Sequence, residues 1–417
     1  MKAGVHIVIL TLALWLIPSS IVTYGADRVH DDPVPDYLMP VAEILSRGEE
    51  AMMPVDGNEV RVFVGGQRKW ESVIEDITSA RRSIYMEYYR WTNDDAGRQI
   101  RDAVLKKIKE GLDVRIMLED ISNPLYSKEF YMRLKRAGAQ VAFFTDTDRP
   151  LPDVLPGINT RDHRKIIVID DEIGYTGGMN LGVSYRDIWR DTHVRVKGPA
   201  VAQLRKLFVD MWIARRGPEQ NNALPPSSEM PEIQPSGDKT LQFATSGGGD
   251  TLLQDAVCRI LESAKSYVYI QTPYFCPTPA LLQALQSSAL RGVDVRVVVP
   301  KETDSKLMTV ANQSFFAECI SSGVKIFEYE VRFNHSKVVL CDGCLSVIGS
   351  LNMDSRSLCI NYEAVAAIFG TEVGDRCMDD YSDLLEHSHE VTLDDLNAWN
   401  AEDKQSRAFW RKHSGQL

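Results

Sequence analysis

Two copies of a short pattern, His-x-Lys-x-x-x-x-Asp, combine in this chain the side chains that handle phosphate. The copies are His163, Lys165 and Asp170, and His335, Lys337 and Asp342. An imidazole acts near neutral pH as a nucleophile or as an acid and base, and an ammonium group stabilises charge on phosphoryl oxygens. Two copies supply two imidazoles and two ammonium groups, a set of groups suited to breaking and re-forming a phosphodiester.

The residues that follow each pattern recur in register. Moving the chain by 172 positions (335 minus 163) superposes further pairs of residues. These pairs are Gly177 with Gly349, Gly178 with Ser350, Asn180 with Asn352, and Asp191 with Glu363. A recurrence that keeps every spacing indicates duplicated structural units, because composition alone does not hold so many positions in register.

The repeated histidines and lysines predict a mechanism. With the two units face to face across a pseudo-twofold axis, Lys165 and Lys337 would clamp a phosphate, and neither a metal nor another cofactor is required. One imidazole would attack phosphorus to form a phosphohistidine. The other would protonate the leaving oxygen and then act as a base on the incoming acceptor. Because one ring must be neutral while the other is protonated, we expect the pair to titrate as a coupled unit.

A small-residue turn and an asparagine follow each pattern, and we predict that they support phosphate binding. Asn180 and Asn352 would donate hydrogen bonds, and Gly178 and Ser350 lie in the turns before them. His193 is predicted to be a strand residue with a local hydrogen bond and not a third catalytic group.

The repeated carboxylates are predicted to have two different roles. Asp191 and Glu363 each lie 28 positions after the histidine of their own copy (191 minus 163; 363 minus 335), which suits an orienting hydrogen bond to the far nitrogen of that ring. Asp170 and Asp342 complete the catalytic motif. Each is predicted to end a strand next to a turn, where it would brace the site and not transfer protons.

The elements that must position these groups alternate between strand and helix, and the second half of the chain repeats the order. The predicted elements are a helix from Trp70 to Ala80, a strand at 83–89, a helix at 97–109, and strands at 114–118 and 141–144. This alternation is typical of a mixed sheet covered by helices. We therefore predict an α/β fold of two homologous halves, each a mixed β-sheet flanked by helices, with the active site between them.

Composition divides the chain further. The predicted parts are a signal peptide or membrane anchor at 1–26, a loosely structured lead-in at 27–58, the first half at 59–217, a proline-containing linker at 218–238, the second half at 239–390, and a C-terminal helix and tail at 391–417. Lys2 precedes an apolar run at 5–22, and acidic residues follow it, which favours a chain whose bulk lies outside the cytoplasm. The residues leave open whether this segment is cleaved or stays as an anchor.

The seven cysteines all lie in the second half of the sequence, so an exported protein would keep at least one of them unpaired. We predict packed thiols, with Asp342 and Gly343 forming a hairpin turn between Cys341 and Cys344. The net charge of −11 argues against general nucleic-acid binding.

Beyond its N-terminal segment, the sequence resembles the phospholipase D superfamily, and within it the bacterial cardiolipin synthases. The resemblance is carried by residues 159–165, 176–180, 189–193, 272–275 and 349–357 together with the repeated pattern. It implies that a phosphatidyl group moves from one phosphatidylglycerol through the phosphohistidine to a second phosphatidylglycerol, giving cardiolipin and glycerol. By family custom His163 is the nucleophile and His335 the acid, although the residues permit the reverse.

The resemblance also implies partners and a location. These are a phospholipid substrate and a membrane surface, with no nucleic acid and no obligate protein partner, at the bacterial cell membrane or exported to the periplasm and the outer face of the inner membrane. Two alternatives use the same residues: a hydrolytic phospholipase D that releases phosphatidic acid, and, less favoured, an exported nuclease.

Overall fold

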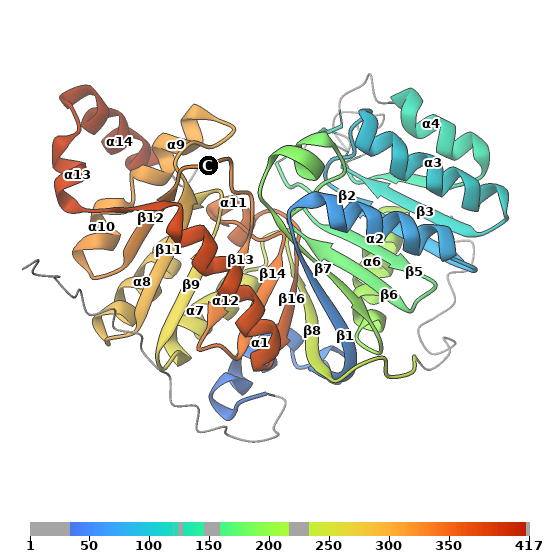
Figure 1. Ribbon diagram of the computed structural model, residues 1–417, viewed down its shortest axis with the longest axis horizontal. Coiled ribbons are helices and arrows are strands. Elements are labelled where there is room, and N and C mark those ends of the chain that lie inside the picture. The colour runs from blue at the N-terminus through green and yellow to red at the C-terminus, as the bar shows by residue number, and fades with distance from the viewer. Residues whose placement is uncertain (1–33, 120, 124–127, 146–158, 217–232, 414–417) are drawn as a thin grey trace, which may run out of the picture. The chain divides into compact units, whose positions relative to one another are not determined.

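One 15-stranded mixed sheet, with helices on both faces, organises the computed structural model, which describes residues 34–119, 121–123, 128–145, 159–216 and 233–413 (Figure 1). The strand order is β17-β12-β11-β9-β13-β14-β16-β8-β1-β7-β6-β5-β2-β3-β4. Between β12 and β4 the order of the second half mirrors that of the first. A mirrored strand order is what a pseudo-twofold axis produces, so the predicted α/β fold of two related halves is confirmed.

The first half contains seven strands and their covering helices. Its elements are β1 (Val55–Val64), α2 (Gly66–Ser79), β2 (Ser83–Tyr88), α3 (Asp95–Lys109), β3 (Asp113–Leu118), α4 (Lys128–Ala137), β4 (Gln140–Phe143), β5 (Lys165–Ile169), β6 (Ile173–Gly177), β7 (Thr192–Lys197) and α6 (Val201–Arg216). Trp70, Val73 and Ile77 form the buried stripe of α2, as their spacing predicts. Every residue of β2 is buried because helices cover both faces of the sheet there.

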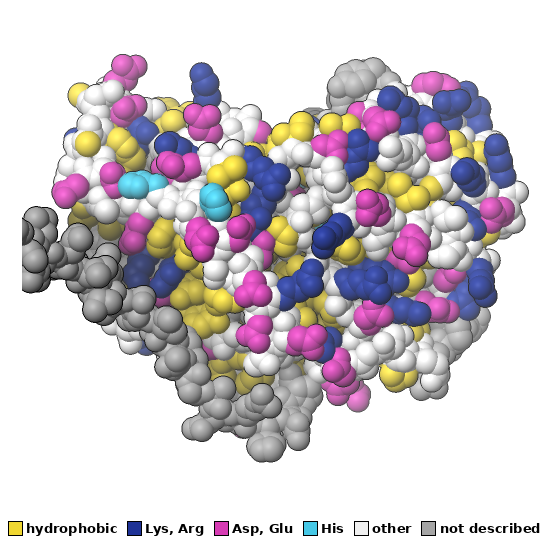
Figure 2. Space-filling view, in the orientation of Figure 1, with side chains coloured by type: hydrophobic (Ala, Val, Ile, Leu, Met, Phe, Trp, Pro, Cys, Tyr) yellow, Lys and Arg dark blue, Asp and Glu magenta, His cyan; other side chains and the backbone are white. Residues whose placement is uncertain are grey.

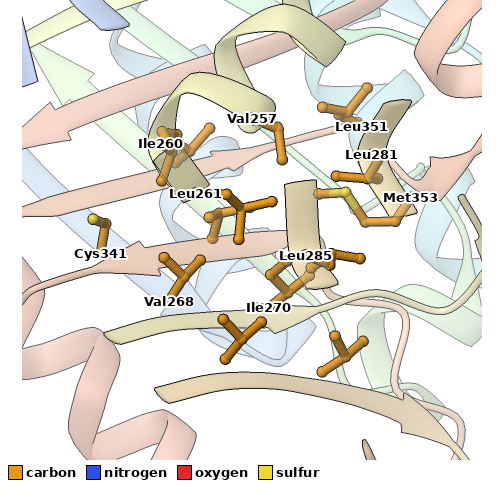
Figure 3. Packing of buried hydrophobic residues seen from close by; sticks show 14 of the residues in the cluster. Val257, Ile260, Leu261, Val268, Ile270, Leu281, Leu285, Cys341, Leu351 and Met353 are labelled. Atoms are coloured by element: carbon orange, nitrogen blue, oxygen red, sulfur yellow. The ribbon is translucent and has the colours of Figure 1, made fainter. Parts of the chain in front are cut away.

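The second half repeats this order. Its elements are β8 (Lys239–Ser246), α7 (Leu252–Ser263), β9 (Tyr267–Gln271), β10 (Phe275–Cys276), α8 (Pro279–Leu290), β11 (Asp294–Pro300), α9 (Lys306–Gln313), α10 (Phe316–Ser321), β12 (Lys325–Tyr329), β13 (Val338–Cys341), β14 (Leu345–Gly349), β15 (Met353–Asp354), α11 (Ser355–Cys359), β16 (Glu363–Phe369) and α12 (Thr371–Glu386). Figure 3 shows how side chains of α7 and α8 pack against Val268 and Ile270 of β9. This apolar layer fixes the sheet that carries the second pattern.

The two halves share a seam and a hydrophobic core. β1 pairs antiparallel with β8, which joins the two sheets into one. One buried cluster includes Val194 and Val196 of the first half together with Phe243 and Ala366 of the second. Across the seam, α6 contacts β8 and α12 contacts β1. The relative position of the halves is therefore held by backbone pairing and by apolar packing.

Asp170 and Asp342 lie in equivalent hairpin turns, with φ of 54° and 50°. The Asp170 carboxylate accepts hydrogen bonds from the backbone N–H groups of Arg81, Arg82 and Ser83 at 2.7–2.9 Å. The Asp342 carboxylate accepts three from residues 265–267, each at 2.8 Å. Both therefore fasten the turn between a helix and the following strand.

The expected loose lead-in at 27–58 is wrong for its described part. Helix α1 (Met39–Ser46) packs Val41, Ala42 and Leu45 into the core of the second half, and β1 already begins at Val55. Tyr37, before α1, donates a hydrogen bond to Asp342 at 3.1 Å. A helix this short gives too few periodic positions to be recognised in the sequence.

The C-terminal region also differs from the prediction of one helix. Strand β17 (Ser388–Val391) adds to the sheet edge beside β12. Two helices follow, α13 (Leu393–Ala398) and α14 (Ala401–His413). The predicted N-terminal segment and most of the linker lie outside the described residues. Among the helices that the structure describes, none is both long and apolar enough to cross a membrane.

Candidate active site

Both histidines lie at the seam, immediately before equivalent strands. His163 precedes β5 and His335 precedes β13, and the backbone of each is tied to the opposite half. The N–H of His163 donates to the carbonyl of Tyr362 at 2.9 Å, and the N–H of His335 donates to the carbonyl of Arg190 at 2.7 Å. Backbone hydrogen bonds between the halves therefore bring the two patterns together at the seam.

The orienting carboxylates are exchanged between the halves. His163 Nδ1 lies 2.9 Å from Glu363, and His335 Nδ1 lies 2.7 Å from Asp191. The prediction that each carboxylate serves the histidine of its own copy is wrong, because Asp191, just before β7, and Glu363, the first residue of β16, both reach across the seam. Both carboxylates are fully buried. Among the described residues, Nε2 of neither ring has a hydrogen-bond partner, so this nitrogen is available to a substrate.

The two lysines lie buried behind the histidines. The ammonium group of Lys165 donates to the carbonyl of His163, and that of Lys337 donates to the carbonyl of His335 at 2.6 Å. Burial lowers the pKa of Lys165 to about 7 and that of Lys337 to about 8, and the buried carboxylates oppose this effect. Burial also raises the pKa of Asp191 to about 7, against the pull of Lys337.

A cavity of about 500 Å³, here called the seam cavity, opens between the halves and is lined by both histidines. Asn180 and Asn352 line it as well, as their predicted role requires. The Asn180 amide donates to Tyr185 at 2.7 Å, and the Asn352 amide donates to Ser357 at 3.2 Å. In each half the residue five positions after the asparagine accepts its hydrogen bond, so equivalent positions hold the two asparagines.

Comparison with known proteins identifies relatives of this chain. Residues 73–212 and 257–385 match the family model described as cardiolipin synthase, PLD-like domain. A cardiolipin synthase of Alkalihalophilus pseudofirmus is 35% identical over 347 residues, which cover 81% of this chain and 68% of that protein. The chain belongs to the cardiolipin synthase family. Cardiolipin synthase 1 of Bacillus anthracis is 31% identical over 84% of this chain and 70% of its own length.

The family match confirms the resemblance predicted from the sequence, and its two segments fall on the two halves of the fold. The crystal structure of phosphatidylserine synthase from Haemophilus influenzae has a TM-score of 0.67 and is 14% identical. The match covers 91% of this chain and 98% of that chain, so the two share their fold. In this member of the cardiolipin synthase family, the two copies of the pattern therefore lie in a fold that the phosphatidylserine synthase shares.

Gly178 and Ser350 lie against the carboxylates and not against the seam cavity. A Cβ on Gly178 would come within 2.1 Å of the Asp191 carboxylate, whereas Ser350 donates a hydrogen bond to Glu363. These two residues were predicted to support phosphate binding. In the structure they instead contact the carboxylates that orient the histidines. The small size of position 178 leaves space for Asp191.

Asp170 and Asp342 are not in contact with the seam cavity. Strand β5 separates Asp170 from Lys165, which at about 3.3 Å per residue is a separation of roughly 16 Å. His193 is a strand residue, as predicted, but the local hydrogen bond is not found: within the described part of the chain, both of its buried ring nitrogens lack a partner.

Sequence reasoning missed several residues that line the seam cavity. The missed residues are Tyr89, Arg90, Asn159, Arg161, Tyr185, Tyr274, Asp304, Met308, Asp354, Arg356, Ser357 and Asn361. The offset of 172 positions could have found some of them, because it pairs Tyr185 with Ser357, the two residues that hold the asparagines. No group of described His, Cys, Asp and Glu residues is arranged to hold a metal ion.

Proposed function

We propose that the protein transfers a phosphatidyl group from one phosphatidylglycerol molecule to another, which gives cardiolipin and glycerol. The observation that carries this proposal is the pair of carboxylate-oriented histidines, one from each half, that face one seam cavity. Membership of the cardiolipin synthase family supports the choice of substrate and product.

The reaction divides into two displacements at phosphorus. In the first, Nε2 of one histidine attacks phosphorus, the bond to the headgroup glycerol breaks, and the other histidine donates a proton to the departing oxygen. In the second, the deprotonated histidine takes the proton of a primary hydroxyl on another phosphatidylglycerol. The resulting oxygen attacks phosphorus and the phosphorus–nitrogen bond breaks. Two phosphatidylglycerols thus become cardiolipin and glycerol, and both histidines return to their starting states.

The phosphate environment supports both displacements. Lys165 and Lys337 place two amines beside the histidines, and a bound phosphate anion would favour their protonated forms. Asn180 and Asn352 add amide groups that line the cavity. Because these groups are buried and held by hydrogen bonds, they are oriented before the substrate arrives, which is the arrangement that stabilises a developing charge most effectively.

A lipid substrate also fits the surface near the seam cavity. Leu307 is 38% exposed and precedes Met308, which lines the cavity, and Ile188 and Val331 are 55% and 61% exposed beside aromatic residues of the His335 end. Exposed apolar side chains around a cavity are typical of sites that meet lipid or another protein. We propose that the rim formed by Leu307, Ile188 and Val331 meets the membrane surface in which the substrate lies.

On the face that Figure 2 shows, acidic side chains are interspersed among basic ones, which is unlike the continuous basic groove of a nuclease.

The test is a reaction of purified protein with phosphatidylglycerol vesicles, followed by identification of the products by mass spectrometry. Cardiolipin and glycerol in equal amounts are expected, with at least about a hundredfold loss in His163→Ala and in His335→Ala. His387→Ala changes an exposed histidine away from the seam cavity and should leave the rate unchanged. Phosphatidic acid as the sole product would assign the protein to hydrolysis instead, and retention of activity in either site variant would refute the two-histidine mechanism.

A further inference from the structure

The repeat allows the two ends of the seam cavity to be compared position by position. At each of five positions a residue of one half corresponds to the residue 172 places away in the other, and the two differ in character. The residues of the His163 end are Asn159, Arg161, Arg356, Ser357 and Asn361, all of which line the cavity. Their counterparts in the repeat are Val331, Phe333, Ser184, Tyr185 and Trp189; Tyr185 lines the cavity, and Phe333 and Trp189 contact the ring of His335. At these five positions the residues beside His163 are polar and three of their counterparts are aromatic, although Arg90 and Asp304 also line the cavity and Arg90 acts electrostatically on His335.

Aromatic rings fill the His335 end. The ring centroids of Tyr185, Trp189 and Phe333 lie 5.5, 5.4 and 5.6 Å from that of His335, and Tyr274 lies at 6.5 Å. At the His163 end the described structure shows a single ring contact, with Tyr89 at 4.9 Å. Among the described residues, aromatic rings therefore crowd His335 more than His163.

An arginine whose charge is not paired with a carboxylate stands at the polar end. Arg356 donates to the side-chain oxygen of Asn159 at 2.9 Å, to its backbone oxygen at 2.6 Å, and to the side chain of Asn361 at 3.5 Å. All of these acceptors are neutral, and no described carboxylate lies within ion-pair distance of Arg356. Five N–H groups on a guanidinium exceed these three bonds, so donors remain for an anion.

A carboxylate and a second arginine complete this end. The backbone N–H of Arg161 donates to Asn361 at 3.3 Å, which places Arg161 on the same wall. Asp354 accepts a hydrogen bond from the backbone of Ser357 at 2.8 Å and lines the cavity, where a carboxylate can accept from hydroxyl groups. The polar end therefore offers the guanidinium of Arg356 and a carboxylate acceptor close together.

We propose that the polar end, with Arg356 at its centre, is the subsite for the phosphate of the acceptor lipid. The proposal rests on the transfer proposed above and adds where the acceptor binds. The acceptor phosphatidylglycerol carries its own phosphodiester three carbons from the attacking hydroxyl, while Lys165 and Lys337 are engaged by the phosphate being transferred. A second anion needs a second cation, and the planar guanidinium forks of arginine suit phosphate oxygens. Water and neutral alcohols would gain nothing from Arg356, so this residue selects the acceptor.

The experiment compares two acceptors in one enzyme. The first reaction is cardiolipin formation from phosphatidylglycerol vesicles, and the second is exchange of deuterated glycerol into phosphatidylglycerol, whose acceptor has no phosphate. Arg356→Gln should lower cardiolipin formation roughly tenfold or more and leave glycerol exchange within about twofold of wild type. Arg161→Gln changes the same wall and should shift the ratio of the two rates in the same direction. Arg68→Gln, which changes an exposed arginine of α2 that does not line the cavity, is the matched control and should change neither rate.

The possible outcomes separate this inference from the proposed function. Equal loss of both reactions in Arg356→Gln and in Arg161→Gln, or no loss of cardiolipin formation in either, would overturn the subsite while leaving the transfer intact. A wild-type protein that catalyses neither reaction would overturn the transfer itself. Because glycerol exchange needs a folded active site, it also shows whether a variant has kept its structure.

Discussion

The exchanged carboxylates determine how the two histidines work. A histidine that donates its Nδ1 hydrogen to a buried carboxylate is held in one tautomer and one orientation, with Nε2 directed to the substrate. Burial lowers the pKa of His163, and Glu363 acts against this effect. Burial lowers the pKa of His335 well below its ordinary value. Burial therefore favours the neutral form of both rings in the resting site, and Glu363 opposes this for His163.

Replacing either carboxylate by its amide tests the exchange. Glu363→Gln removes the group that raises the pKa of His163, so this pKa falls further and the protonated form is lost at a lower pH. We expect Glu363→Gln and Asp191→Asn to lower kcat by about tenfold or more, since each disturbs the tautomer of a ring. The pH dependence of kcat in the two variants is the measurement. Because the pairs cross the seam, Glu363→Gln should reproduce the effects of changing His163, and a resemblance to His335 variants would contradict the geometry.

The polar subsite also assigns the histidine that carries the phosphoryl group. In an in-line displacement the acceptor enters opposite the nucleophile, so an acceptor at the His163 end requires His335 to form the bond to phosphorus. With a phosphatidyl ester of p-nitrophenol, whose leaving group needs no proton, His163→Ala should still form a covalent intermediate, detectable as a mass increase of the protein. His335→Ala should form none. The opposite pattern would restore the assignment of His163 as nucleophile that family custom implies.

The lysines predict how substrate binding depends on pH. Burial places the pKa of Lys165 at about 7 and that of Lys337 at about 8, so each amine is protonated below that pH and neutral above it. In the proposed mechanism, a phosphate anion binds the protonated amines. The KM for phosphatidylglycerol should therefore rise as the pH increases through 7 to 8, with a smaller rise in Lys337→Arg because a guanidinium stays charged. A KM that stays constant between pH 6 and 9 would show that the lysines remain protonated throughout.

At the scale of elements, the hairpin aspartates contribute to stability and not to catalysis. Each accepts three backbone hydrogen bonds at the turn that follows α2 or α7. Asp170→Ala or Asp342→Ala leaves these N–H groups without their partner, at a cost of about 1.5–3 kcal/mol. Thermal unfolding should show a Tm lower by roughly 2–3 °C. Asp379→Ala, an exposed aspartate of α12, is the control, and loss of kcat without loss of Tm would instead place the aspartates in the reaction.

The elements also show what the sequence could predict. Helices α2 and α3 and strands β2 and β3 agree with prediction because their apolar spacing runs over several turns or over a whole buried strand. Helix α1 and strand β17 were not predicted, because each is too short to establish a period. The pairing of Glu363 with His163 could not be predicted either, since a repeat in the sequence shows which residues are equivalent but not which half they face.

At the scale of the whole molecule, the sheet and the site depend on the same seam. The pairing of β1 with β8 and the shared core join the halves, and each histidine takes its carboxylate from the other half. A half alone would expose the apolar residues of the seam and would leave a buried carboxylate without its histidine. Both halves must therefore be present for the site to form, even though each half carries a complete copy of the pattern.

This dependence can be tested by dividing the chain at residue 225, within the predicted linker. The segments 1–225 and 226–417 should each be inactive alone, because each lacks one histidine and the carboxylate of the other. Produced together, they should associate through the seam and recover cardiolipin formation. A first segment with His163→Ala, paired with the unchanged second segment, should associate equally well and stay inactive, which separates assembly from catalysis. Activity in one segment by itself would mean that two copies of the same half can build the site, and the presence of both different halves would then not be required.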